Sequence, residues 1–576
     1  MPQWKEGRFR TADGLNLFYR YKEPQEPTDN ALFFLHRGHE HSARVIPFAD
    51  KISQNNYWCF AMDLRGHGHS EGDRAWAENF EAWVKDLNSF VGHIRHTFHT
   101  NPANSILVAN SVGSVIAVSW ILNYGPGIKG CILGAPAFSI KLYIPFALGF
   151  LKLASKFSDK LFVTSYVRSG LLTRDKDEAR AYDDDKLITK KIGVNILITL
   201  FSNIKNCFNR LKDFETDVLV ITAEKDYIVD NKLHKKFING ISSSTREHIV
   251  LANFRHAIFH EKDQQQLITH CQNFIQNRFK DITAHLPAVI PEARSHTVEE
   301  HKKLSANPAP VEHIYYSCYR FMLKMAGKLS QGISTGLKYG FDSGLSLDYI
   351  YRNQSTGNNI LGRIIDRIYL NSVGWRGIRT RKENLKKTLI GTLQLLNKDG
   401  IHPIILDIAS GPGRYLFETQ QEMPFPVSLQ LNDNDNNSLQ LAKKIAVDYK
   451  ATDTSFTNHD AFTLDAHIVN SEQLPNVIIV SGLFELYDNN LQVQRAISQL
   501  YKTIKTGGYL IYTGQPWHPQ IEMIGRVLNN RNGDRWVMRR RIQREMDLLV
   551  ESTGFRKLNT AADDNGIFTV SCARKC

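Results

Sequence analysis

Short buried apolar runs alternate with helical segments along two separate stretches of this 576-residue sequence. In the first half the runs occupy residues 31–35, 58–62, 105–109, 128–133, 218–222 and 248–252. Continuous apolar runs this short, separated by helices, indicate a parallel sheet covered on both faces. A second series occupies residues 403–408, 427–431, 476–480 and 509–513. The pattern therefore predicts two α/β domains, which suits a chain too long for a single core.

The boundary between the two series is a proline-rich, charged stretch at 284–311 without apolar periodicity, which predicts a linker. We therefore expect one domain over residues 1–283 and another over residues 312–576. In the first domain the alternation stops between 138 and 205, where the lysine-punctuated apolar segment 141–157 predicts a helical cap over the sheet. In the second, residues 312–396 predict a helical extension, interrupted near the Gly- and Ser-rich segment 332–344.

Charge and cysteine usage limit the compartment and the partners. The net charge of +13 favours anionic partners, and basic residues cluster at 376–387 and 539–544. A solvated helix face is the first interpretation of each cluster, an anionic lipid or substrate the second, and nucleic acid the third and least favoured. Seven scattered cysteines without a CxxC pair indicate a reducing compartment. Without a signal peptide or a long apolar run, we expect a cytoplasmic protein, with peripheral contact to the inner membrane left open.

The strand-like run at 105–109 leads through the sequence ANSVG into an apolar helix, with Ser111 at the turn. A serine between small residues at such a turn is typical of a nucleophile elbow, which lifts the hydroxyl above the sheet. An ordinary serine N-cap is the alternative interpretation. Asp226 and His256 each follow a later strand-like run, so the order Ser111, Asp226, His256 suits a catalytic triad.

A serine hydrolase also needs two donors for the oxyanion of its tetrahedral intermediate. The backbone N–H of Val112, directly after the serine, is the first candidate. Gly38, in the loop HRGHEHS at 36–42, is the second, because glycine permits close backbone approach. The histidines of that loop lack the spacing of a zinc site, so we expect no metal there.

Three features of the first domain carry a family resemblance: the loop HRGHEHS, the segment DLRGHGHSEG at 63–72, and the elbow with its acid and histidine. In these features the domain resembles the monoacylglycerol lipase and lysophospholipase branch of the α/β hydrolases. The resemblance covers most of the first domain. It implies a carboxylic-ester hydrolase acting on a lipid with one acyl chain, a lysophospholipid or a monoacylglycerol. Arg37 and His39 stand where that family usually has glycines, and Ala109 replaces the elbow glycine. We expect the segment 63–72 to be structural.

In the second domain the strand-like run at 403–408 enters the loop DIASGPGRY, which begins at Asp407. An acid followed by G-x-G at a strand-to-helix turn is typical of a nucleoside site, where Gly411 and Gly413 let the cofactor approach the backbone. The dinucleotide fingerprint fails because Leu416 occupies its third glycine position, and no P-loop lysine follows.

What remains resembles the first motif of class I S-adenosylmethionine methyltransferases, with Tyr415 at the usual third glycine position. The resemblance implies S-adenosylmethionine as cofactor and a Rossmann-like fold. It further implies that Asp433, with Asp435 as second choice, binds the ribose, that Asp460 lies near the adenine, and that Ser481 borders the cofactor and acceptor. A solvated acidic turn is the alternative for Asp433.

The methyl acceptor is left open by the sequence. The absence of an Asp/Asn-Pro-Pro-Tyr motif argues against methylation of base amino groups, and the lack of a cysteine after the fourth strand argues against cytosine C5. His518, in the segment QPWHP, is either a base facing the acceptor or a packed loop histidine. A lipid or small-molecule acceptor fits best.

The whole chain also resembles a bacterial family of fused hydrolase–methyltransferase proteins. We therefore predict an α/β-hydrolase fold with a helical cap followed by a class I methyltransferase fold, in a bifunctional enzyme of lipid metabolism. One alternative is a hydrolase regulated by an inactive domain that senses S-adenosylmethionine, motivated by Tyr415. Another is a nucleic-acid methyltransferase carrying a hydrolase, motivated by the arginine clusters.

Overall fold

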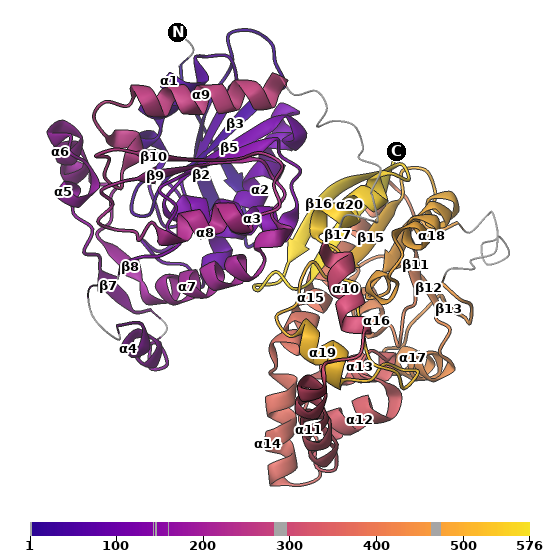
Figure 1. Ribbon diagram of the computed structural model, residues 1–576. Helices are drawn as coiled ribbons and strands as arrows, with labels where there is room; N and C mark the ends of the chain where they lie inside the picture. Colours follow the sequence, from indigo (N-terminus) through magenta and orange to yellow (C-terminus); the bar gives the residue numbers. More distant parts are fainter. Residues whose placement is uncertain (1–2, 142, 144–146, 159, 281–295, 462–473) are drawn as a thin grey trace. The chain divides into compact units, whose positions relative to one another are not determined.

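In the computed structural model the chain divides into two compact units, Met1–Leu286 and Pro287–Cys576. Each unit contains one large sheet with helices on both faces (Figure 1). The structure describes residues 3–141, 143, 147–158, 160–280, 296–461 and 474–576. Both units confirm the predicted α/β fold class.

The first unit has an eight-stranded sheet in the order β1-β2-β4-β3-β5-β6-β9-β10, in which only β2 runs antiparallel to its neighbours. Its strands are β1 (Lys5–Arg10), β2 (Asn16–Lys22), β3 (Ala31–Leu35), β4 (Trp58–Met62), β5 (Ser105–Asn110), β6 (Gly130–Gly134), β9 (Val218–Ala223) and β10 (Arg246–Leu251). Helices α1 (Ile46–Ser53) and α9 (Gln265–Lys280) cover one face; α2 (Phe80–Phe98), α3 (Val112–Tyr124) and α8 (Lys232–Gly240) cover the other (Figure 1). This is the order of an α/β-hydrolase sheet.

Six of the eight strands coincide with the predicted apolar runs. Strands β3, β5 and β6 are buried along their whole length because helices lie on both sides of them. The edge hairpin β1–β2 was not predicted, since charged side chains interrupt its apolar residues and much of β1 is exposed.

The cap lies between β6 and β9 in the sequence. It contains α4 (Ala147–Ala154), α5 (Ser169–Leu172), α6 (Lys176–Asp184) and α7 (Val194–Asn209). It also contains a two-stranded sheet of β7 (Phe162–Thr164) and β8 (Lys191–Gly193), which the prediction of a helical cap missed. Residues 142, 144–146 and 159 of the cap lie outside the described residues.

The second unit has a seven-stranded sheet in the order β13-β12-β11-β14-β15-β17-β16, in which only β17 is antiparallel to its neighbours. Its strands are β11 (Ile404–Ile408), β12 (Ser428–Asn432), β13 (Thr454–Thr457), β14 (Val477–Val480), β15 (Tyr509–Gly514), β16 (Phe555–Ala562) and β17 (Thr569–Lys575). Helices α15 (Val373–Lys398), α16 (Arg414–Glu422) and α17 (Asn436–Asp448) pack on one face, while α18 (Asn490–Thr503) and α20 (Gln543–Glu551) pack on the other. This order is the Rossmann-like arrangement of class I methyltransferases.

The predicted helical extension consists of α11 (Pro310–Gly327), α12 (Gln331–Tyr339), α13 (Gly344–Arg352), α14 (Ile360–Leu370) and the long helix α15. The interruption is shorter than predicted, because α12 occupies most of 332–344 and the chain turns at Gly340, whose φ is +89°. A last helix, α19 (Ile521–Val527), packs against α11.

The linker prediction was wrong for residues 296–311, where α10 (His296–Ser305) and the start of α11 form instead. Residues distant in sequence hold α10 in place. Arg540 donates to Glu300 at 2.6 Å, and Arg539 donates to Thr297 at 2.7 Å. These contacts exist only once the chain is folded, so composition could not reveal them. Residues 284–295 of the predicted linker lie outside the described residues.

The interpretation of the basic clusters as solvated helix faces was also wrong for half of their members. Arg539, Arg540 and Arg541 are buried, and so is Arg381. Arg541 donates to the carbonyls of Phe484 and Tyr487, both at 2.8 Å. These cations serve internal packing and are not available to a nucleic acid. Among the described residues, no helix is both long and apolar enough to cross a bilayer.

Candidate active sites

Ser111 stands at the sharp turn between β5 and α3, with a φ of +55° and a ψ of −116°. This conformation is strained for a residue with a side chain and is common at functional sites. The turn is held by the Ser111 N–H, which donates to the Gly134 carbonyl at 2.8 Å. Gly113 has no room for a side chain, since a Cβ there would lie 2.7 Å from the His36 carbonyl oxygen.

The structure brings the three predicted triad side chains into one hydrogen-bonded chain. The Ser111 Oγ lies 2.7 Å from His256 Nε2, and His256 Nδ1 lies 2.7 Å from Asp226 Oδ2. The other Asp226 oxygen accepts from the backbone N–H groups of Ile228 and Val229, both at 2.8 Å. Burial alone would raise the pKa of Asp226, but His256 and these two N–H groups lower it. An ionised Asp226 holds the imidazole with its proton on Nδ1, so Nε2 is free to accept the serine proton.

The two predicted oxyanion donors lie against each other. Val112 is the first residue of α3, where a backbone N–H has no partner within the helix. A Cβ on Gly38 would lie 3.5 Å from Val112 Cγ2, so the backbone of the loop passes beside the start of α3. Both residues line the same cavity as Ser111.

The departures from the family in this loop have local explanations. The buried Arg37 donates to Glu40 at 2.8 Å and stacks over the Tyr182 ring at 5.0 Å. Burial, followed by the charge of Arg37, lowers the pKa of His39 to about 4, so this imidazole is neutral at pH 7. His36 accepts from the Leu64 N–H at 3.1 Å. These side chains therefore shape the loop, and no metal-binding group of three ligands occurs among the described residues.

The segment 63–72 also holds the loop at 36–42 in place through hydrogen bonds. Asp63 accepts from the backbone N–H groups of Ser42 at 2.6 Å and His69 at 2.8 Å. A Cβ on Gly68 would collide with the Asp63 carboxylate. The expected structural role of this segment agrees with these contacts.

A cavity of about 460 Å³ opens above Ser111 and His256. Apolar side chains of the cap, including Leu151, Val163 and Ile196, form much of its wall. A volume in the range of small-molecule sites, with a few polar groups at one end, suits a substrate with an apolar chain.

In the second unit, the loop between β11 and α16 has positive φ at alternate residues: +56° at Ala409, +55° at Gly411 and +61° at Gly413. Residues 409, 411 and 413 therefore occupy the three glycine positions of the motif, and an alanine stands at the first of them. The assignment of Tyr415 to its third glycine position was wrong, because Tyr415 lies in the first turn of α16. A count of sequence positions could not show which residues adopt the left-handed conformation.

Asp407 and Tyr415 form a buried pair behind this loop. The Tyr415 hydroxyl donates to one Asp407 oxygen, while the other Asp407 oxygen has no partner among the described residues. Burial raises the pKa of Asp407 to about 8. A buried carboxyl with a free oxygen beside a glycine loop is suited to receive a ligand donor.

The two acids after β12 differ in what they do. Asp433 accepts from the Gly411 N–H at 2.7 Å, which ties the second strand to the glycine loop. Asp435 caps α17 by accepting from the N–H groups of Asn437 and Ser438, both at 3.1 Å. Asp433 is therefore the acid that faces the loop.

A cavity of about 80 Å³ adjoins the loop, lined by five of the six predicted cofactor residues: Asp407, Gly411, Gly413, Asp433 and Ser481. Asp460 is exposed and does not line it. The cavity is small because α13 covers the loop. A Cβ on Gly344 would lie only 2.8 Å from Pro412 and 3.1 Å from the Gly411 Cα.

A second cavity of about 530 Å³ lies beside the first and shares the lining residues Asp342, Leu347, Arg381, Gly482 and Leu486 with it. Arg381 and Glu485, which also lines the larger cavity, were not predicted as site residues. The sequence did contain one signal for Glu485, its position just after the fourth strand. Arg381 was hidden in a basic cluster.

His518 lines the larger cavity, and its environment decides between the two interpretations of its role. Burial lowers its pKa to about 4, so it is neutral. Its Nδ1 accepts from the Gln520 N–H at 3.0 Å, which leaves the ring proton on Nε2. His518 is therefore a donor toward the cavity, and the prediction of a base is not supported.

Comparison with known proteins agrees with this two-part architecture. The family described as “Putative methyltransferase” matches residues 271–575. The chain belongs to this family. The family described as “Serine aminopeptidase, S33” matches residues 26–263, so the methyltransferase domain is fused to an α/β-hydrolase domain. A protein of Escherichia coli (strain K12), “Uncharacterized protein YnbC”, is 35% identical, and the match covers 98% of this chain and 97% of that protein.

Several relatives that match the first unit alone are named as lipases or phospholipases. “Phospholipase YtpA” of Bacillus subtilis (strain 168) is 24% identical over 42% of this chain and 93% of its own length. “Monoglyceride lipase” of Homo sapiens is 27% identical over 38% of this chain and 73% of its own length. The crystal structure of Paleococcus ferrophilus monoacylglycerol lipase matches with a TM-score of 0.40 and 16% identity, over 48% of this chain and 99% of that one. The first unit is thus a lipase-like hydrolase domain.

Proposed function

We propose that the first unit hydrolyses the ester of a lipid that carries one acyl chain, a monoacylglycerol or a lysophospholipid. The hydrogen-bonded chain from Ser111 through His256 to Asp226, at the end of an apolar cavity, carries this proposal. The printed names of the relatives, a phospholipase and a monoglyceride lipase, support the substrate class.

In this mechanism the Ser111 Oγ attacks the ester carbonyl while its proton passes to His256 Nε2. The N–H groups of Val112 and Gly38 bind the resulting oxyanion. His256 then protonates the leaving alcohol, and water, deprotonated by the same imidazole, releases the fatty acid and restores Ser111. Asp226 stabilises the imidazolium formed in each step.

A fluorophosphonate probe tests the nucleophile. We expect the full-length protein to be labelled, Ser111→Ala to lose the label, and Ser89→Ala, a helical serine outside the cavity, to keep it. Undiminished labelling of Ser111→Ala would refute the assignment.

We further propose that the second unit binds S-adenosylmethionine and transfers its methyl group. The residues beside the glycine loop suit this cofactor in chemistry: Asp407 has a free buried oxygen, and Asp433 can accept from ribose hydroxyls. Arg381 forms no salt bridge within the described ranges, so its buried charge favours an anionic group. Because the loop cavity is only about 80 Å³, we propose that α13 moves away from Gly411 when the cofactor binds.

S-adenosylmethionine supplies an electrophilic methyl group. The chain's own contribution is to orient the acceptor and to receive its proton. Glu485 lines the acceptor side, and burial raises the pKa of its carboxyl, partly offset by Arg381. A carboxylate with a raised pKa is a better base for the proton that the acceptor loses.

Calorimetric titration of the full-length protein with S-adenosylhomocysteine tests cofactor binding, and a silent titration would exclude it. The two alternative functions lose their motivation. Tyr415 lies in a helix outside the loop, so it no longer favours a degenerate, sensing domain. The arginines that suggested nucleic acid are largely buried.

We also propose peripheral contact of the cap with an anionic lipid surface. Phe150, Leu153 and Phe157, on and just after α4, are exposed, and Lys152 and Lys156 lie among them. Apolar side chains interleaved with lysines suit the interface of an anionic bilayer. Co-sedimentation with anionic but not neutral liposomes is the expected result, and its absence would refute the contact.

A further inference from the structure

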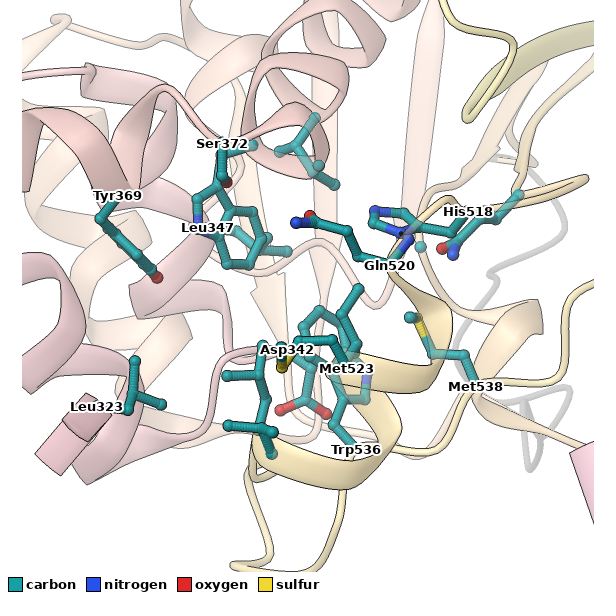
Figure 2. A pocket seen from close by; sticks show the side chains of 18 of the residues that line it. Leu323, Asp342, Leu347, Tyr369, Ser372, His518, Gln520, Met523, Trp536 and Met538 are labelled. Carbon is teal, nitrogen blue, oxygen red and sulfur yellow. Dashed lines mark hydrogen bonds between the residues drawn. The ribbon is translucent and has the colours of Figure 1, made fainter. Parts of the chain in front are cut away.

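The larger cavity of the second unit has the size and enclosure of a substrate site. Its volume of about 530 Å³ falls within the usual range for small-molecule pockets. It lies among α11, α14, α15, α19 and the segments that follow β14 and β15. Figure 2 shows side chains from these separate parts of the chain arranged around one space.

Apolar atoms form most of the wall of this cavity. Leu323, Met523 and Met538 surround it, with Trp536 beside them (Figure 2). Methionine side chains adapt to ligands of variable shape, which suits a flexible hydrocarbon chain. The polar groups of a ligand would find few partners along this apolar part of the wall.

Charged groups gather where this cavity meets the glycine-loop cavity. Arg381 and Asp342 line both cavities, and Glu485 lines the larger one. The buried Arg381 has only a weak contact to Tyr351, at 3.4 Å, and stacks over the Phe568 ring at 5.3 Å. These charged groups offer a ligand with one polar head a place next to the proposed cofactor.

The opposite side of the cavity reaches an apolar rim. Met322 on α11 and Ile368 on α14 line the cavity and are nevertheless 53% and 70% exposed. Other exposed apolar residues continue along the same two helices: Ile314, Phe321, Met325, Ile360, Leu361 and Ile364. These exposed side chains give an apolar chain a path of entry along α11 and α14.

We propose that this cavity is the acceptor site and that the methyl acceptor is a single-chain amphiphile, with its acyl chain between α11 and α14 and its oxygen-bearing head at Arg381 and Glu485. This inference rests on the proposed methyltransferase function of the second unit. It narrows the acceptor from any lipid or small molecule to one that carries a long hydrocarbon chain.

Photolabelling with a diazirine analogue of palmitic acid tests the site without relying on turnover. The full-length protein is irradiated with the probe, and the labelled peptides are mapped. We expect label in peptides that contain residues 319–326 and 523–538, removed by excess palmitate, in addition to label in the cap of the first unit. Label confined to the first unit would overturn the proposal.

Two variants sharpen the result. Ala326→Trp fills the cavity from α11, and Met322→Glu places a charge at its exposed rim. We expect each variant to lower labelling of the second unit several-fold. Labelling of the cap should persist in both. Val447→Trp and Val447→Glu, at a position on α17 that is 76% exposed and outside the cavity, are the matched controls. Because Met322 is exposed, its variant should fold even if Ala326→Trp does not. Unchanged labelling of the second unit in Met322→Glu would contradict the proposed entry.

Failure of the acceptor inference can be told apart from failure of the proposed function. If S-adenosylhomocysteine gives no heat, the cofactor proposal fails, and the acceptor assignment fails with it. If it binds and radioactive methyl groups enter only water-soluble material, the methyltransferase function stands and the amphiphile is wrong. Methyl label in the organic extract, lost in Met322→Glu, would support both.

Discussion

The two sites of this chain differ in how much of each is already assembled. In the first unit Ser111, His256 and Asp226 are in hydrogen-bond contact below an open cavity of about 460 Å³. In the second, α13 rests on the glycine loop and leaves about 80 Å³. Hydrolysis needs only water and one substrate, so its polar groups can be fixed in advance. Methyl transfer needs two ligands in contact, and under the proposed function part of that site forms when the cofactor binds.

The largest effect should follow from removing the charge that orients His256. We expect Asp226→Asn to lower kcat for ester hydrolysis by about 10³- to 10⁴-fold, because the amide no longer favours the imidazole tautomer that accepts the serine proton. S-adenosylhomocysteine binding should not change. Asp185→Asn is the control, since Asp185 forms another close Asp–His pair, at 2.8 Å from His41. Equal losses in both variants would mean that the triad is not the catalytic group.

A smaller effect is expected when the acid of the second site is removed. Asp433→Ala should weaken S-adenosylhomocysteine binding about 10- to 100-fold, through loss of charge-assisted hydrogen bonds to the ligand and to Gly411. Asp435→Asn keeps an acceptor for the cap of α17 and should bind normally. Calorimetry measures both. If Asp435→Asn loses more affinity than Asp433→Ala, the roles of the two acids are reversed.

The buried Asp407 should make the stability of the second unit depend on pH. Its pKa is raised to about 8, so at intermediate pH the folded chain keeps a proton that the unfolded chain has lost. The free energy of unfolding should therefore fall between about pH 4 and pH 8, by up to about 1.4 kcal/mol per pH unit. Asp407→Asn should reduce the change of the melting temperature of the second unit with pH over this range. Asp399→Asn, at an exposed position, should leave this pH dependence unchanged. A slope that survives Asp407→Asn must come from another group.

The smallest effect concerns the movement of α13, which is proposed for the second site and has no counterpart in the first. Binding of S-adenosylhomocysteine should change amide hydrogen exchange in α13, because the ligand displaces Gly344 from Gly411. Exchange in α3, which follows Ser111, should stay the same. Unchanged exchange in α13 with a bound ligand would show that the cofactor enters without moving this helix.

Much of the first site follows from local sequence. Small residues around Ser111 allow a tight strand-to-helix turn, and the two triad partners each follow a strand, β9 and β10. Parallel strands align their carboxyl ends, so residues at those ends share one edge of the sheet. The three triad residues meet because β5, β9 and β10 lie close together in the strand order. The hairpin β1–β2 was missed because charged side chains interrupt its apolar residues, and β7 and β8 were missed because each is only three residues long.

The second site was less predictable. Glycine spacing alone did not show that Ala409 adopts a positive φ, and Asp460 was placed at the cofactor by resemblance although it lies outside the loop cavity. Arg381 and Glu485 come from segments about a hundred residues apart. Only packing of the helical extension against the sheet brings them to one cavity.

By itself, the sequence determined the two α/β units, the elbow at Ser111 and the order of the chemical groups along the chain. These depend on hydrophobic periodicity and on backbone conformation, which are properties of neighbouring residues. The tertiary structure alone decided that the arginines at 539–541 are internal, that α10 folds in the expected linker, and that an apolar cavity opens beside the glycine loop. Burial of a charge or creation of a cavity depends on partners distant in sequence, and no local pattern encodes it.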